Sequence, residues 1–68
     1  GSPELDNLLE EAYRRYLEAN NAPPGRKKLA YTSEKMCKED PALAHLISDI
    51  TEHSLRKFLQ SQTKSGEI

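Results

Sequence analysis

Residues 5–17 read LDNLLEEAYRRYL, and the spacing of their apolar side chains predicts an amphipathic helix. These side chains recur at intervals of three and four residues and so share one stripe: Leu5, Leu8, Leu9, Ala12, Tyr13, Tyr16 and Leu17. Charged residues fill the other side, where Glu11 and Arg15 have the spacing of an ion pair one turn apart. Pro3 is a start signal and the prolines at 23–24 are stop signals, so we expect a helix over residues 3–19.

Downstream of this helix, residues 20–25 form a predicted loop, because consecutive prolines and a glycine do not continue a helix. The next stretch predicts a second helix over about 27–39, whose apolar positions share a face with the small Ser33. Those positions are Leu29, Ala30, Met36 and Cys37. The alternative is a shorter helix over 34–39, capped by Thr32 or Ser33.

A new helix start is marked by Asp40 and Pro41, which are typical of an N-cap and a first helical position. One apolar stripe follows at Leu43, Leu46, Ile47 and Ile50, and another at Leu55, Phe58 and Leu59. On a straight helix the second stripe is rotated by roughly 120° from the first. We therefore expect a break near 49–51, with Thr51 capping a final helix, which gives helices over 41–49 and 52–62. A continuous helix is the alternative.

The resulting fold class is all-α, because no segment alternates apolar and polar residues as a strand does. We predict a small single-domain bundle of three to four short helices, at about 3–19, 27–39, 41–49 and 52–62. Residues 3–62 make up the domain, and 63–68 are expected to be a flexible tail. Gly1 and Ser2 have the character of a cloning remnant and carry no functional interpretation.

Length and composition exclude several classes of protein. The chain has 68 residues, a net charge of −1 and one cysteine, so it has no internal disulfide framework. A domain this small buries only about 60% of its unfolded surface and does not readily wall a deep catalytic cleft. No apolar run approaches the ~18 residues of a membrane span, and no signal-peptide pattern is present. We expect an intracellular protein, cytoplasmic or nuclear, that is not an enzyme, needs no cofactor and does not insert into a membrane.

Metal-ligand and thiol chemistry is weakly represented. The spacing of Cys37, His45 and His53 fits none of the close paired patterns of zinc sites, so no metal is expected. His45, Asp49 and His53 line up only if the helix continues through residue 51. Cys37 follows an apolar residue in the second helix, and a free cysteine most often behaves as a small buried apolar side chain.

Charge is distributed in blocks of alternating sign. Residues 26–38 carry five bases and one acid, whereas residues 39–54 carry four acids and no base. The concentrated positive block makes a nucleic-acid contact the second hypothesis for function, since lysines and arginines bind phosphates without reading sequence. The residues assigned to that contact are Arg26, Lys27, Lys28, Lys35, Lys38, Arg56 and Lys57.

Residues 42–60 also resemble known DNA-binding helices. The stretch 42–50, the capped restart at Thr51 and the run LRKFL at 55–59 resemble a helix-turn-helix, with a turn about one residue longer. The string DIT at 49–51, followed by Leu55, Phe58 and Leu59, is similar to a segment of the tyrosine-recombinase core-binding domain, a helical DNA clamp. This resemblance implies DNA contact, with Arg56 and Lys57 as the phosphate ligands.

The first hypothesis for function is a non-catalytic interaction module from a larger protein. A bundle this small leaves some apolar side chains outside, and a groove between two helices suits the amphipathic helix of a partner protein. Self-association through the first helix is a variant of this hypothesis. Aromatic residues and methionine are common interface anchors, and this chain offers Tyr13, Tyr16, Tyr31, Met36 and Phe58. A connected exposed apolar patch drawn from at least two helices is the expected sign of such a module.

Overall fold

The first helix, α1 (Pro3–Asn20), forms where the apolar stripe predicts it. The computed structural model describes the backbone of residues 3–66 and the side chains of residues 3–62. As expected, Arg15 Nε donates to Glu11 Oε2 at 3.1 Å. Asn21 ends the helix with a φ of 54° and donates its N–H to the carbonyl of Leu17 at 2.7 Å, a left-handed C-cap.

The apolar stripe of α1 is buried only along its first half. The fully covered side chains end at Ala12, and Tyr13 and Tyr16 are half-buried. Leu17 was expected on the core face but is 39% exposed. The last turn of α1 therefore extends past the packed part of the molecule, which the periodicity of a single helix does not reveal.

The second helix, α2 (Arg26–Glu39), begins directly after Gly25 and has no side-chain N-cap. Thr32 Oγ1 donates to the carbonyl of Lys28 at 2.9 Å, and Ser33 Oγ donates to that of Leu29 at 2.8 Å. Both hydroxyls bond the preceding turn of their own helix, so neither caps a shorter helix. The longer helix is confirmed, and the alternative over 34–39 is wrong.

The third element, η1 (Pro41–Asp49), is a 3₁₀ helix. Its predicted start is confirmed, because the carboxylate of Asp40 accepts the N–H of Ala42 at 3.0 Å. Residues three apart eclipse one another in a 3₁₀ helix, so Leu43 and Leu46 point the same way. Ile47 was placed in the inward stripe on α-helical spacing, but it is turned away and is 41% exposed.

The predicted break after η1 is confirmed, and the continuous helix is wrong. Ile50 and Thr51 separate η1 from α3 (Glu52–Gly66). Thr51 Oγ1 accepts the N–H of Ser54 at 3.2 Å, and Ser54 Oγ accepts the N–H of Thr51 at 2.9 Å. This reciprocal pair is a capping box with serine in place of the usual acid or amide. Residues 63–66 of the expected tail continue α3, while residues 67–68 and the remnant at 1–2 lie outside the described residues.

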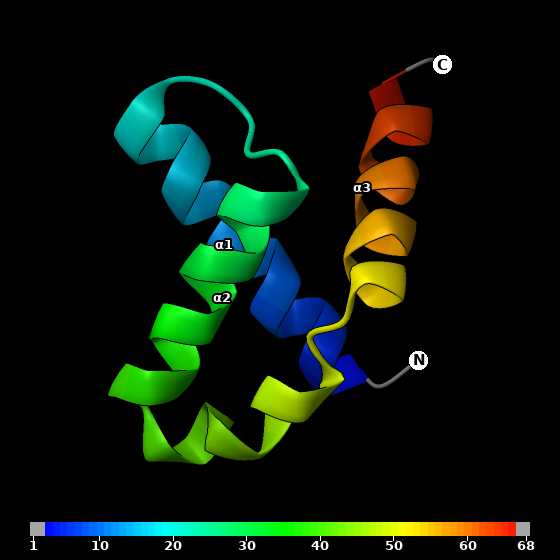
Figure 1. Cartoon of the computed structure of the whole chain (residues 1–68). Helices are drawn as coiled ribbons and strands as arrows, with labels where there is room; N and C mark the ends of the chain where they lie inside the picture. Colours follow the sequence, from blue (N-terminus) through cyan, green and yellow to red (C-terminus); the bar gives the residue numbers. More distant parts are fainter. Residues whose placement is uncertain (1–2, 67–68) are drawn as a thin grey trace.

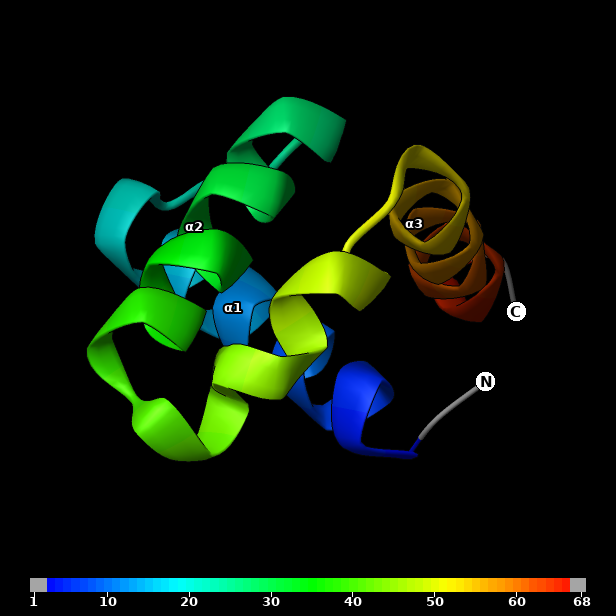
Figure 2. The ribbon, with the colours of Figure 1, turned by 60° about the horizontal axis from the view of Figure 1, so that its bottom comes forward.

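The elements assemble into an all-α bundle, and no strand occurs within residues 3–66. α1 passes behind α2, and η1 forms a bridge from the end of α2 to the start of α3 (Figure 1). Viewed nearly along its axis, α3 lies beside the other elements (Figure 2). The buried core draws on all four elements and consists of Leu5, Leu8, Leu9, Ala12, Leu29, Met36, Cys37, Leu46 and Leu55.

Candidate functional site

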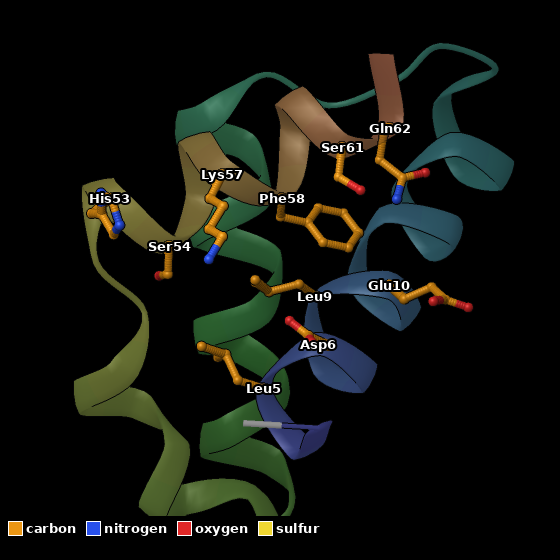
Figure 3. A pocket seen from close by; sticks show the side chains of 10 residues that line it. All are labelled: Leu5, Asp6, Leu9, Glu10, His53, Ser54, Lys57, Phe58, Ser61 and Gln62. Carbon is orange, nitrogen blue, oxygen red and sulfur yellow. The ribbon is translucent and has the colours of Figure 1, made fainter. Parts of the chain in front are cut away.

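A groove lies between α1 and α3. Its volume is about 600 Å³ (Figure 3). One side is formed by α1 and the other by α3, and the lining residues are Leu5, Asp6, Leu9, Glu10, His53, Ser54, Lys57, Phe58, Ser61 and Gln62. We call this feature the α1–α3 groove.

Apolar side chains from both helices form the floor of the α1–α3 groove. Leu5 and Leu9 reach from α1, and Phe58 projects from α3 toward them (Figure 3). The two leucines belong to the core, whereas Phe58 is only half-buried. The ring of Phe58 is held edge-on against Tyr13, with centroids 6.0 Å apart and planes at 63°. Phe58 is thus a fixed aromatic surface that leaves part of its ring accessible.

The α1 side of the α1–α3 groove carries the negative charges of Asp6 and Glu10, and the α3 side carries the positive charge of Lys57 (Figure 3). His53 also lies on the α3 side. The ion pairs found among the described side chains involve none of these four residues. Asp6, Glu10 and Lys57 thus form no ion pair with another described side chain, which favours contact with a partner.

Polar contacts join the start of α3 to α2 and η1. Arg26 Nη1 lies 3.0 Å from Glu52 Oε1, which joins the first residues of α2 and α3. The other carboxylate oxygen of Glu52 lies 3.6 Å from Arg56 Nη2. Ser54 Oγ also donates to the carbonyl of Asp49 at 2.9 Å and ties the capping box back to η1. These contacts fix one end of the helix that forms one side of the groove.

The residues predicted to anchor a partner are divided among different places. Phe58 lines the α1–α3 groove. Tyr16, Tyr31 and Met36 come together at a second concavity of about 270 Å³ between α1 and α2, which we call the α1–α2 hollow. Tyr13 packs against Phe58 and lines a separate depression of about 310 Å³ with Pro23 and Pro24. Met36 is 8% exposed and belongs to the core, whereas Tyr31 is 67% exposed.

The large apolar residues that are exposed among the described side chains come from three elements. Leu17, Tyr31 and Ile47 lie on α1, α2 and η1 respectively. Apolar surface that two helices share lines the concavities described above. Sequence reasoning missed most of the groove residues, since the edge of a helical stripe becomes a groove only once a second helix is placed beside it. The signal within α1 is the spacing of Leu5, Asp6, Leu9 and Glu10, which marks one edge of the stripe.

The residues assigned to a nucleic-acid contact are also divided. Arg26 and Arg56 both meet Glu52. Lys57 lines the α1–α3 groove on α3. The remaining four lysines, Lys27, Lys28, Lys35 and Lys38, are exposed on α2.

Metal-ligand chemistry is not concentrated anywhere in the described part of the chain, where no group of three histidine, cysteine or acidic residues could hold an ion. His45 Nε2 lies 3.3 Å from Glu4 Oε2, away from the groove that His53 lines. Cys37 is 2% exposed, in the expected core position. Burial raises the pKa of its thiol, and the negative charge of Glu34 adds to this effect.

Comparison with known proteins finds no matching family model, no matching curated protein and no matching solved structure. None of the helices within residues 3–66 combines the length and apolar character that crossing a membrane requires.

Proposed function

We propose that this chain is a non-catalytic helical interaction module whose α1–α3 groove binds an amphipathic helix from a partner protein. The observation that carries the proposal is the groove itself, with an apolar floor between two helices and charges of opposite sign on its sides that form no ion pair among the described side chains. A helix seated there adds one more helix to the bundle, which is a common way for small helical domains to bind peptides.

The floor of the groove suits an apolar stripe. On α3 its lining runs from His53 to Gln62, which is about 13 Å of helix at 1.5 Å per residue. That length accommodates two to three turns of a partner helix, enough for apolar side chains at the usual intervals of three and four residues. Phe58 supplies the aromatic surface, and aromatic side chains in central positions often contribute most to binding.

The charges on the two sides specify the chemistry of the partner. A bound helix needs basic side chains along the edge that faces Asp6 and Glu10. It needs an acidic side chain along the edge that faces Lys57. Complementary charges of this kind fix the orientation and register of a bound helix more than they raise its affinity.

The experiment uses two synthetic amphipathic peptides of about 18 residues, long enough for several helical turns. Both carry leucines on one face; one has lysines along one edge and glutamates along the other, and the second has glutamine at all those positions. We expect the charged peptide to bind more tightly. On addition of this peptide, the amide NMR signals of the protein should shift at residues 5–10 and 53–62 and stay unchanged on the outer face of α2.

Matched charge reversals on α1 test the assignment of the groove. Glu10→Lys places a repulsive charge beside the lysine edge of the peptide and should weaken binding about five-fold, as expected for exposed charges worth about 1 kcal/mol. Glu18→Lys makes the same change at an exposed position of α1 outside the groove and should leave binding unchanged. Equal effects of the two variants, or perturbations centred on another surface, contradict the proposal.

A further inference from the structure

The outer face of α2 carries four lysines around one exposed tyrosine. Relative to Tyr31, the lysines lie at −4, −3, +4 and +7, which are positions on the same side of a helix. Tyr31 is 67% exposed. From first to last these residues span about 16 Å of helix at 1.5 Å per residue. We call them the lysine face: Lys27, Lys28, Tyr31, Lys35 and Lys38.

The four lysines of the lysine face make no evident contribution to the stability of the fold. The ion pairs found among the described side chains use none of its four lysines. Lys27 and Lys28 lie in the first turn of α2, which contains no acid, so they repel one another and the positive end of the helix dipole. The two acids of α2 leave the lysines in excess: Glu34 is half-buried, and Glu39 lines the far end of the α1–α2 hollow from Tyr31, two turns along the helix. A bound polyanion would relieve this repulsion.

The α1–α2 hollow adjoins the lysine face and adds aromatic surface. Tyr31 and Lys35 belong to both, and Tyr16 from α1 lines the same hollow. Arg15 also lines it, although its guanidinium already contacts Glu11. The hollow measures about 270 Å³ and has tyrosines from two helices among its walls. The hollow can therefore accept a flat aromatic ring, such as an unstacked nucleobase, that stacks against Tyr31 and enters beside Tyr16.

We propose that the lysine face and the α1–α2 hollow together bind single-stranded nucleic acid, with phosphates on the lysines and an unstacked base on Tyr31. A single strand fits better than a duplex, because duplex bases are stacked inside and do not reach an exposed tyrosine. Positive charge that follows the backbone, combined with aromatic rings for the bases, is the usual design of single-strand binding surfaces. The surface is separate from the α1–α3 groove, so the two binding activities can be tested independently.

The experiment measures fluorescence anisotropy with labelled oligo-dT and oligo-U of about 12 nucleotides, within the usual range of site sizes. A DNA duplex of equal length and a polyglutamate peptide serve as competitors. We expect both single strands to bind more tightly than the duplex and polyglutamate to compete poorly. The logarithm of the binding constant should fall with the logarithm of salt concentration with a slope of about −3, as four phosphate contacts on a single strand predict.

Substitutions separate the roles of the ring and the charges. Tyr31→Leu should weaken single-strand binding by about 5- to 100-fold without changing the salt slope, and Tyr31→Phe should restore it, since stacking needs the ring and not the hydroxyl. Lys27→Gln combined with Lys28→Gln should reduce the slope by about 1.4. Arg14→Gln removes an exposed base on α1 that belongs to neither proposed site and should change neither quantity.

Four results overturn the proposal. Absence of binding at low salt does so, as does duplex binding as tight as single-strand binding. Equal binding by the wild type and Tyr31→Leu also overturns it, because the surface would then attract polyanions by charge alone. Effective competition by polyglutamate would instead identify an acidic protein segment as the ligand.

Discussion

α2 and α3 have nearly the same length, 14 and 15 residues, but they are held in the molecule in different ways. α2 buries four residues, Leu29, Ser33, Met36 and Cys37. Among the described side chains of α3 only Leu55 is buried, and Phe58 and Leu59 are half-buried. The comparison shows a central helix that organises the core and a peripheral helix attached along one edge. The α1–α3 groove lies beside the peripheral helix, where less packing closes the space between helices.

Removing packing from α2 should have the largest effect on the stability of the bundle. Leu29 is 0% exposed, so Leu29→Ala leaves a cavity at the centre of the bundle. We expect a loss of about 3–5 kcal/mol in the free energy of unfolding, which is comparable to the whole stability of a small domain. Circular dichroism should show a largely unfolded chain at 25 °C. Tyr31→Ala on the exposed side of the same helix should change stability by about 0.5 kcal/mol or less.

The matching change in α3 should release one helix and leave the rest folded. Leu55 is 4% exposed, and Leu55→Ala should cost about 2–3 kcal/mol, the lower part of the usual range, because its surroundings are more open. Hydrogen exchange should lose protection over 55–62 and keep it over 29–37. Uniform loss of protection in both helices would show that α2 and α3 unfold as one unit.

The reactivity of Cys37 offers a second way to distinguish unfolding of α2 from release of α3. It lies near the C-terminal end of α2, whereas α3 starts beside the opposite end, where Arg26 meets Glu52. Burial holds the pKa of the thiol above its ordinary value, so the folded state favours the protonated form. The contribution of this preference to stability is therefore lost as the pH rises above the pKa of the unfolded thiol. At pH 8, alkylation of Cys37 should be slow in the wild type and in Leu55→Ala and fast in Leu29→Ala.

A smaller effect is expected from the cap of α3. Thr51→Ala removes the oxygen that accepts the Ser54 N–H at 3.2 Å, while Ser54 keeps its bond to Asp49. The loss should be about 1 kcal/mol, measured by urea denaturation, and it should weaken protection in the first turn of α3 more than in α2. Ser48→Ala changes an exposed hydroxyl in η1 and is the control. A loss as large as that of Leu55→Ala would mean that the cap, not the apolar contact, holds α3.

Local signals in the sequence account for most of the fold. The stripe of α1, the cap at Asp40 and the break at Thr51 depend on neighbouring residues, and each was predicted correctly. The exposure of Leu17 and Ile47 was not, since it depends on how far a helix extends past its neighbours and on whether a short helix winds as α or 3₁₀. The α1–α3 groove was beyond prediction for the same reason, because it depends on the rotation of α3 about its own axis and its distance from α1.

The start of α2 differs from the start of α3 in having no capping side chain, and it offers the smallest predicted effect. Gly25 occupies the N-cap position with a φ of −81°, which any residue adopts, and a Cβ built there meets no atom within 4 Å. Gly25→Ser should therefore stabilise the protein by about 0.5 kcal/mol, because its hydroxyl can accept an N–H of the first turn and the unfolded chain loses freedom. Gly25→Ala only reduces the freedom of the unfolded chain. The free energy of unfolding measured by urea denaturation should therefore be higher for Gly25→Ser than for Gly25→Ala. If the two variants are equal, the first turn of α2 gains nothing from a cap, and tertiary packing alone explains why this helix starts at Arg26.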